Sequence, residues 1–364
     1  MKIWVYAISK NERQFCERFM ASCAEADGVS VLDTGSEDGT AERLIELGAD
    51  VGVRKFTPWR FDFARNAALD MVPEDVDVCV SLDLDEVLAP GWRKALEAAW
   101  AQGVTRARYT YVWSHAADGA DGVTFFADKI HARHGYKWRY PVHEILVPAD
   151  GAETQVVIPD LRVDHWPDSH KSRASYLPLL ELAVREDPMN DRNTHYLGRE
   201  YMFHGRWGAA METLMKHLAL PTATWAAERA ASMRYIARCC DALGDWCSAV
   251  HWLERAADEA PTQREAPYEL ATLYYRRSDW ALCRYWAMRT QYITERDYNY
   301  MTEPECWGPE PYDLEALANW NLGHYDEAVS AARKALELSP DDKRLQRNLE
   351  IIQASAKEGE RHEG

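Results

Sequence analysis

The sequence has no long hydrophobic run and no closely paired cysteines. No apolar stretch approaches the roughly 18 residues of a membrane-spanning helix, and the N-terminal run IWVYAI is too short for a signal peptide. None of the eight cysteines forms a CxxC pair, which argues against a zinc site or a disulfide framework. Cysteines in apolar segments, such as Cys16, Cys23 and Cys79, are expected to be buried thiols of a cytoplasmic protein.

Basic residues are also scarce relative to acidic ones. The chain has 42 Lys and Arg against 59 Asp and Glu, a formal net charge of −17. Broad nucleic-acid binding depends on basic surfaces, so this balance argues against it but leaves one local groove possible. The 364 residues are enough for two domains that each bury a core.

Residues 1–170 alternate short apolar runs with helical patterns. Strands are expected over residues 2–8, 29–33, 51–56 and 77–82, and helices follow the first three. Strands and helices in alternation, joined by short links, predict a parallel sheet covered on both faces. We therefore expect an α/β domain here.

Polar clusters end three of these strands, at residues 9–12, 33–38 and 83–86. Parallel sheets bind ligands beyond the carboxyl ends of their strands, so the clusters mark a site. The last cluster sets Asp83, Asp85 and Glu86 side by side, where like charges repel. A hard divalent cation, Mn or Mg, between Asp83 and Asp85 would relieve that repulsion. The alternative is a solvated acid cluster, and Glu86 is expected to be structural.

Residues 171–354 show helical periods and an internal repeat. Four similar triplets each separate two expected helices: Gly205-Arg-Trp207, Gly244-Asp-Trp246, Ser278-Asp-Trp280 and Gly323-His-Tyr325. Their spacing, with small residues at Ala210, Ala249 and Ala328, predicts an all-α solenoid similar to tetratricopeptide repeats, whose period is about 34 residues. Residues 355–364 are expected to form a flexible tail.

Four segments of the N-terminal half resemble the family-two nucleotide-sugar glycosyltransferases, which have the Rossmann-like GT-A fold. They are AISKNE, DTGSEDGT at 33–40, FARNAAL at 63–69 and the DxD pair Asp83 and Asp85. The resemblance covers residues 1–170, and the repeats resemble those of bacterial and phage members. It implies metal-dependent inverting transfer of a sugar from a nucleoside diphosphate, expected to be UDP, to an acceptor hydroxyl.

The resemblance also implies roles for single residues on the donor side. Asp33 would read the nucleotide base, or else cap a turn, and Glu12 would lie near the nucleoside. Arg65 and Asn66 would face the diphosphate together with Asp83. The alternative for Arg65 is a surface pair with Asp62.

Three further residues complete the implied chemistry. Asp83 and Asp85 would hold the metal with His165 as third ligand, and His143 competes with His165 for that role. Glu144, within the expected strand YPVHEILV, would act as the base that deprotonates the acceptor. The alternative is a salt bridge from Glu144 to Arg139 or to an Arg of the repeats.

Residues 104–143 reverse the global charge, with six Lys or Arg and three Asp among many aromatic residues. We expect an acceptor surface here that includes Arg133, Lys137 and Trp138; the alternative is core aromatics with basic edges. The acceptor could be a glycan, a protein or a hydroxymethylated base in phage DNA. A different class of function is an inactive GT-A scaffold whose repeats recruit a protein partner or self-associate.

Overall fold

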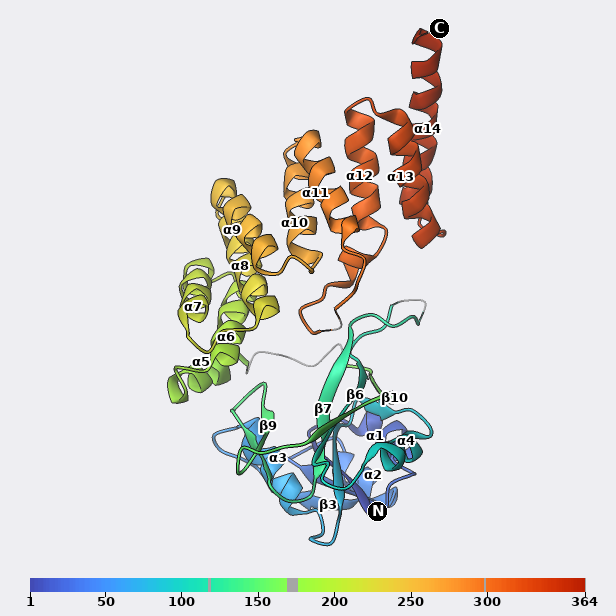
Figure 1. The fold of residues 1–364 in the computed structure, drawn as a ribbon. Coiled ribbons are helices and arrows are strands. Elements are labelled where there is room, and N and C mark those ends of the chain that lie inside the picture. Colours follow the sequence, from blue (N-terminus) through green and yellow to red (C-terminus); the bar gives the residue numbers. More distant parts are fainter. Residues whose placement is uncertain (117–118, 169–175, 298, 364) are drawn as a thin grey trace. The chain divides into compact units, whose positions relative to one another are not determined.

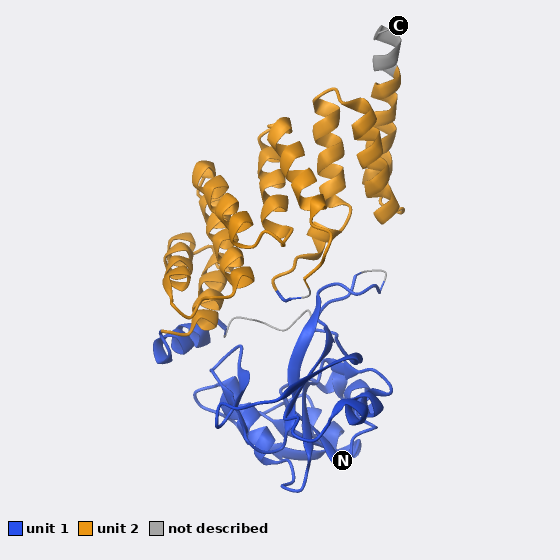
Figure 2. Ribbon diagram, viewed as in Figure 1, with its two compact units in different colours: residues 1–188, 298–300 blue, residues 189–297, 301–364 orange. Residues whose placement is uncertain are grey.

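The computed structural model describes residues 1–116, 119–168, 176–297 and 299–363, with no side chains described from residue 358 onward. The chain divides into two compact units (Figure 2). The first comprises residues 1–188 and 298–300, and the second comprises residues 189–297 and 301–364. The expected boundary after residue 170 lies outside the described residues. Helix α5 (Tyr176–Glu186), which the sequence placed with the repeats, belongs to the first unit.

The first unit contains a twisted sheet (Figure 1). Among the described residues, its strand order is β3-β2-β1-β4-β7-β6-β10-β5. Its strands are β1 (Ile3–Ser9), β2 (Gly28–Asp33), β3 (Asp50–Val53), β4 (Val78–Asp83), β5 (Glu86–Leu88), β6 (Arg106–Val112), β7 (Thr124–Ala132) and β10 (Gln155–His165). The four strands expected from the sequence pair in parallel, which confirms that prediction. β7 runs antiparallel between β4 and β6, and β10 is parallel to β6.

The strand register brings the polar strand ends together. Ser9 is opposite Asp33 in the β1–β2 pair, and Ile8 is opposite Asp83 in the β1–β4 pair. The carboxyl ends of β2, β1 and β4 therefore meet at one edge of the sheet. The sequence predicted this convergence from the parallel strands alone.

Hydrophobic cores cover both faces of this sheet. Val5 and Ala7 of β1 belong to a core that includes Phe19 of α1 (Cys16–Ser22), Leu44 of α2 (Thr40–Glu46) and Leu96 of α4 (Trp92–Ala99). Tyr6 and Ile8 belong to the other core, with Ala64 and Ala68 of α3 (Phe61–Asp70). Because side chains alternate along a strand, a strand buried on both faces is apolar at almost every position.

The segment YPVHEILV is not the continuous strand expected from its sequence. Only its last residues enter β9 (Ile145–Pro148), which pairs with β8 (Tyr136–Arg139) in a small separate sheet. Tyr140 and His143 have φ values of 82° and 48°, a left-handed conformation that breaks a strand. Glu144 therefore lies at the end of an irregular turn.

The second unit consists of paired helices, four pairs of which flank the predicted triplets (Figure 1). These pairs are α6 (Asp191–Phe203) with α7 (Trp207–Ala219), α8 (Ala226–Ala242) with α9 (Trp246–Glu259), α10 (Glu265–Arg276) with α11 (Trp280–Tyr292), and α12 (Glu310–Asn321) with α13 (Tyr325–Leu338). Helix α14 (Lys343–Glu363) follows, and it extends through most of the range expected to be a tail.

Small residues allow the helices of this unit to pack closely. Ala210, Ala249 and Ala328, which follow three of the triplets, are buried, and Cys283 is buried in the remaining pair. A Cβ on Gly198 would lie 2.6 Å from the side chain of Leu214, so a larger residue there would separate α6 from α7. No helix of the described residues combines the length and the apolar character needed to cross a bilayer.

Candidate active site

Asp33 is the last residue of β2, and both oxygens of its carboxylate accept hydrogen bonds from nearby residues. Its Oδ1 accepts from the backbone N–H groups of Gly35 and Ser36 at 2.9 and 2.8 Å. Its Oδ2 accepts from the hydroxyls of Ser9 and Ser36 at 3.0 and 2.6 Å. The turn-capping alternative thus describes this geometry. Base reading by Asp33 stays a prediction, because it requires some of these bonds to be exchanged.

Glu12 and Asn66 are also engaged within the protein. Glu12 is buried, and its Oε2 lies 3.3 Å from the backbone nitrogen of Lys10. Asn66 exchanges two hydrogen bonds of 2.9 Å with the backbone of Trp138. Asn66 therefore holds β8 against α3. Its expected contact with the donor finds no support in this geometry, and that of Glu12 stays a prediction.

Arg65 of α3 joins two of the predicted site residues. Its Nη2 donates to Oδ1 of Asp83 at 2.7 Å, and its Nε donates to Glu144. The alternative pair with Asp62 is wrong, because Asp62 pairs with Arg60 at 2.8 Å. Within the first unit, Glu144 pairs with Arg65 and not with Arg139. Burial alone would lower the pKa of Arg65, but the charges of Asp83 and Glu144 outweigh it and raise that pKa.

One donor of Arg65 remains open. Its Nη1 is buried and has no hydrogen-bond partner among the described residues. The guanidinium also lies over the ring of Trp138, 5.0 Å from the centroid, which fixes its plane. A buried N–H without an acceptor is costly, but this nitrogen is inaccessible to solvent, so a ligand oxygen would reach it only if neighbouring side chains moved.

Lys129, one of the six basic residues of the stretch 104–143, also belongs to the site, although nothing in the sequence singled it out. Its Nζ lies 2.8 Å from Oε1 of Glu86 and 3.3 Å from Oδ2 of Asp83. Burial lowers the pKa of Lys129, but the charges of Asp83 and Glu86 more than compensate and raise it. Glu86 also accepts from the hydroxyl of Tyr111 at 2.8 Å, which fits its expected structural role. The only signal in the sequence was a lysine within the apolar pattern of β7.

Asp85 faces His165, which brings together two of the three predicted metal ligands. Nε2 of His165 lies 3.5 Å from Oδ2 of Asp85, and its Nδ1 lies 2.9 Å from the carbonyl oxygen of Trp113. Burial lowers the pKa of His165, but the hydrogen bond to Asp85 and the carbonyl of Trp113 outweigh it and raise that pKa. A ligating histidine usually donates its other N–H to such a carbonyl. His143 instead makes a ring contact with Tyr176.

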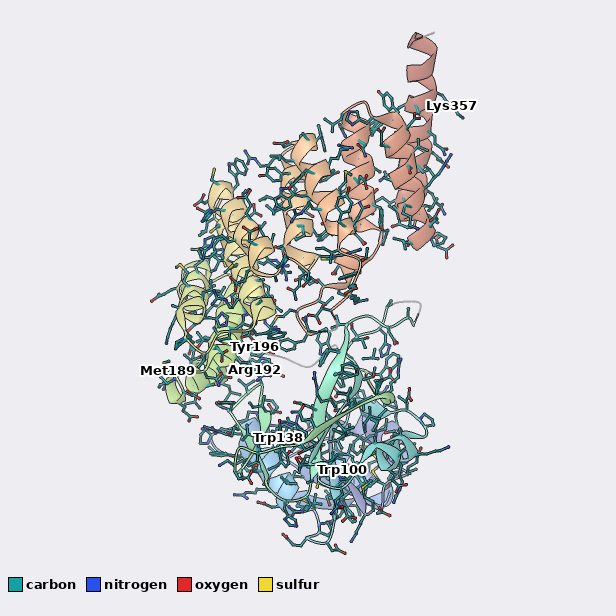
Figure 3. All side chains as sticks on the ribbon, viewed as in Figure 1. Trp100, Trp138, Met189, Arg192, Tyr196 and Lys357 are labelled. Atoms are coloured by element: carbon teal, nitrogen blue, oxygen red, sulfur yellow. The ribbon has the colours of Figure 1, made fainter. Side chains whose placement is uncertain are left out.

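Two of the three residues expected on the acceptor surface are buried, which corrects that prediction. The guanidinium of Arg133 donates to the carbonyl oxygen of Val72 at 2.8 and 3.1 Å. Trp138 packs in the core beside α3 (Figure 3), and its Nε1 donates to the hydroxyl of Tyr6 at 2.8 Å. Lys137 alone is exposed. The alternative of core aromatics with basic edges describes this stretch better.

A second group of possible metal ligands lies near His165. His115, Asp121 and Asp164 bring their ligand atoms within 4.8 Å of one another. However, the guanidinium of Arg162 donates to Asp121 at 2.7 Å through two nitrogens and to Asp164 at 2.6 Å. A cationic side chain therefore already balances these carboxylates.

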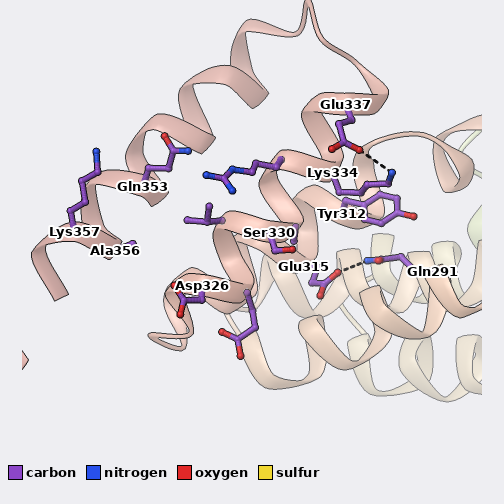
Figure 4. Close-up of a pocket in the computed structure, with 14 residues that line it drawn as sticks. Gln291, Tyr312, Glu315, Asp326, Ser330, Lys334, Glu337, Gln353, Ala356 and Lys357 are labelled. Carbon is purple, nitrogen blue, oxygen red and sulfur yellow. Dashed lines mark hydrogen bonds and ion pairs between the residues drawn. The ribbon is translucent and has the colours of Figure 1, made fainter. Parts of the chain in front are cut away.

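The second unit contains a cavity of about 980 Å³ against helices α12, α13 and α14 (Figure 4). Its lining mixes acidic and basic residues, including Glu315, Asp326, Lys334 and Lys357. Two contacts join residues of the lining: Lys334 pairs with Glu337 at 3.0 Å, and Gln291 donates to Glu315 at 2.6 Å. The cavity carries no cluster of one charge.

The comparisons with known proteins concern the repeats. The family model described as "Tetratricopeptide repeat" matches residues 309–342, which span α12 and α13. The C-terminal part is therefore a helical solenoid of tetratricopeptide type. No curated protein matches the chain.

Solved structures similar to the chain include MamA and a repeat-containing protein of Cytophaga hutchinsonii. The MamA structure is 22% identical, covers 46% of this chain and 89% of that one, and gives a TM-score of 0.37. The Cytophaga structure is 14% identical, covers 51% and 67%, and gives a TM-score of 0.42. At these TM-scores the likenesses carry no argument about activity.

Proposed function

We propose that the first unit is a glycosyltransferase of GT-A fold, metal-dependent and inverting. It would move a sugar from a UDP-sugar donor to an acceptor hydroxyl. The observation that carries the proposal is Arg65, which is buried at the strand ends, bound to Asp83 and Glu144, and left with Nη1 open. Such a guanidinium suits the oxygens of a diphosphate.

The donor set at the strand ends fits a divalent cation. Asp85 and His165 offer a carboxylate and an imidazole nitrogen that face each other, and the carbonyl of Trp113 orients the imidazole. Asp83 is contacted by Arg65 and Lys129, two cations that already balance its charge. A bound Mn²⁺ or Mg²⁺ would supply Lewis-acid stabilisation of the departing diphosphate.

The residues of this chain would act on both partners of the reaction. The acceptor oxygen forms a bond to the anomeric carbon from one side while the bond to the diphosphate breaks on the other. Glu144 takes the acceptor proton on Oε2, which has no partner among the described residues, while Arg65 holds its Oε1. Arg65 and Lys129 supply positive charge beside the leaving group.

The repeats have a separate role in this proposal. Tetratricopeptide repeats commonly mediate protein interactions, and we infer that the second unit brings the enzyme to a protein that carries or delivers the acceptor. The competing function is a scaffold without activity. That function would leave the open donor of Arg65 and the pairing of Asp85 with His165 without a purpose.

Hydrolysis of the donor by the full chain tests the proposal. Purified protein is incubated with Mn²⁺ and a pool of nucleotide sugars, and release of nucleoside diphosphate is measured by mass spectrometry. We expect release that EDTA abolishes and that Asp85→Asn reduces strongly. His134→Asn, which changes an exposed histidine that pairs with Glu74, is the control. Absence of release and of nucleotide binding would favour the scaffold.

A further inference from the structure

Two exposed tryptophans lie beside the candidate metal ligands. Trp113 follows β6 and Trp166 follows β10, and they are 41% and 40% exposed. Large aromatic side chains bury most of their surface in a folded protein, and exposed apolar surface at a site marks a binding surface. Their place beside the candidate metal ligands, and not their exposure alone, distinguishes them from an equally exposed tryptophan such as Trp225.

A backbone contact joins each tryptophan to one of the candidate metal-ligating residues. The carbonyl of Trp113 contacts Nδ1 of His165 at 2.9 Å, and the N–H of Trp166 donates to the carbonyl of Asp85 at 2.8 Å. The backbone of each tryptophan therefore keeps a fixed position relative to the Asp85–His165 pair.

Ring contacts fix the planes of these side chains. The ring of Trp113 lies 6.2 Å from that of His165 at an interplanar angle of 30°. The ring of Trp166 stacks on His115 with a centroid distance of 3.9 Å and an angle of 8°. Rings held in this way lose little conformational entropy when a ligand covers their exposed part.

The cations of this sheet edge do not form the row of available charges that a nucleic-acid backbone requires. Its cations are each paired with two carboxylates: Arg65 with Asp83 and Glu144, Lys129 with Asp83 and Glu86, and Arg162 with Asp121 and Asp164. In the described part of the chain, this edge therefore presents exposed aromatic rings to a ligand, next to cations whose charge is already balanced by carboxylates. A nucleic-acid backbone requires a row of available cations instead.

The order of strands in the sheet separates the tryptophans from the strands that would bind the nucleotide. Asp33 ends β2, Asp83 ends β4, and the tryptophans follow β6 and β10, which lie beyond β4 and β7 in the sheet. A donor that spans from Asp33 to Asp83 would therefore point its sugar and the acceptor toward the β6–β10 side. This step rests on the proposed function.

We propose that Trp113 and Trp166 form a platform that stacks against a saccharide ring, so that the acceptor is a carbohydrate. The axial C–H bonds of a pyranose carry partial positive charge, and the faces of indole rings are negative, so the two attract. The platform takes the place of the buried Arg133 and Trp138 as the acceptor surface.

Saturation-transfer NMR on the full chain tests the platform without donor or metal. The probes are methyl α-D-glucopyranoside, methyl β-D-galactopyranoside, N-acetylglucosamine and a single-stranded oligodeoxynucleotide. We expect saturation of the ring protons of at least one sugar, and a loss of affinity of about tenfold or more in Trp113→Leu and Trp166→Leu. Leucine keeps apolar volume, so both variants should fold. Trp225→Leu, at a tryptophan of similar exposure (39%), should match the wild type.

The outcomes separate the platform from the proposed function. Saturation of no sugar, equal saturation in the leucine variants, or saturation of the oligonucleotide alone would each overturn the platform. Thermal stabilisation by UDP with Mn²⁺ reports on the donor site separately. Sugar binding without that stabilisation would keep the platform and reject the transferase.

Discussion

Nε2 of His165 lies 3.5 Å from Oδ2 of Asp85, at the ends of strands that are far apart in the sequence. A metal bound by both residues should stabilise the fold by linkage, because only the folded chain brings the two side chains together. We expect Mn²⁺ with UDP to raise the melting temperature of the wild type. His165→Asn should lose most of that increase, measured by differential scanning fluorimetry, whereas His134→Asn should retain it. An equal increase in His165→Asn would remove His165 from the metal site.

The second prediction concerns the buried charges around Arg65. Arg65→Met leaves Asp83 and Glu144 without their shared cation, and breaking a buried ion pair costs about 3–5 kcal/mol. Urea unfolding should show a loss of this size. Adding Glu144→Gln should recover part of it, because one unpaired charge is then removed. Lys2→Ala, which breaks an exposed pair with Asp75, should change stability little. A double variant less stable than Arg65→Met would contradict this account.

The third prediction is a pH dependence due to His131. Burial lowers the pKa of this imidazole from 6.5 to about 3. Between those values the unfolded chain binds a proton that the folded protein excludes, so this contribution to stability is present above pH 6.5 and is lost as the pH falls. The full slope for one group is about 1.4 kcal/mol per pH unit.

His131→Gln removes the titrating group while offering another acceptor to the hydroxyl of Tyr6, which lies 2.9 Å from Nε2. Its free energy of unfolding should fall less steeply than that of the wild type between pH 6 and pH 4, by roughly the slope of one proton. Parallel pH profiles for wild type and His131→Gln would reject the assignment.

The fourth prediction concerns the turns between paired helices. Gly205, Gly244 and Gly323 have φ values of 67°, 81° and 80°, and Ser278 adopts 58° at the matching position. A left-handed conformation costs an L-residue about 1–2 kcal/mol, and glycine loses about 0.5–1 kcal/mol in entropy. Ser278→Gly should therefore stabilise the second unit slightly in urea. Gly244→Ala, where a Cβ meets nothing within 4 Å, isolates the backbone term and should destabilise it.

Local patterns were enough to predict the central part of the first unit and the repeats. A strand buried on both faces is apolar along its length, so β1, β2 and β4 were visible, and their polar ends followed from the parallel arrangement. The triplets at Gly205, Gly244, Ser278 and Gly323 predicted the turns because a left-handed residue must end each first helix.

The site residues that escaped prediction depend on contacts between distant segments. Lys129 reaches Asp83 and Glu86 because β7 runs antiparallel beside β4, and no local pattern specifies that pairing. Arg133 and Trp138 were expected at a surface because long basic and aromatic side chains can lie at an edge or in a core. Arg133 and Trp138 are buried because they bond to Val72 and Tyr6, which are distant in the sequence. The sequence alone does not reveal these contacts.

The last prediction concerns Glu144 as the base. Glu144→Gln keeps the shape of the side chain and can still accept from Nε of Arg65 through its amide oxygen, so the fold and donor binding should persist. The amide cannot take the acceptor proton, and transfer should fall by about 10²–10⁴-fold, the usual contribution of a positioned base.

Donor hydrolysis and transfer to the saccharide found by NMR are measured on the same preparation, with UDP and Mn²⁺ stabilisation as the test of donor binding. Glu74→Gln, at an exposed carboxylate that pairs with Arg133, is the matched control and should transfer normally. Full transfer by Glu144→Gln would show that another group takes the proton, and Asp164 and Asp168 would then be the carboxylates to replace.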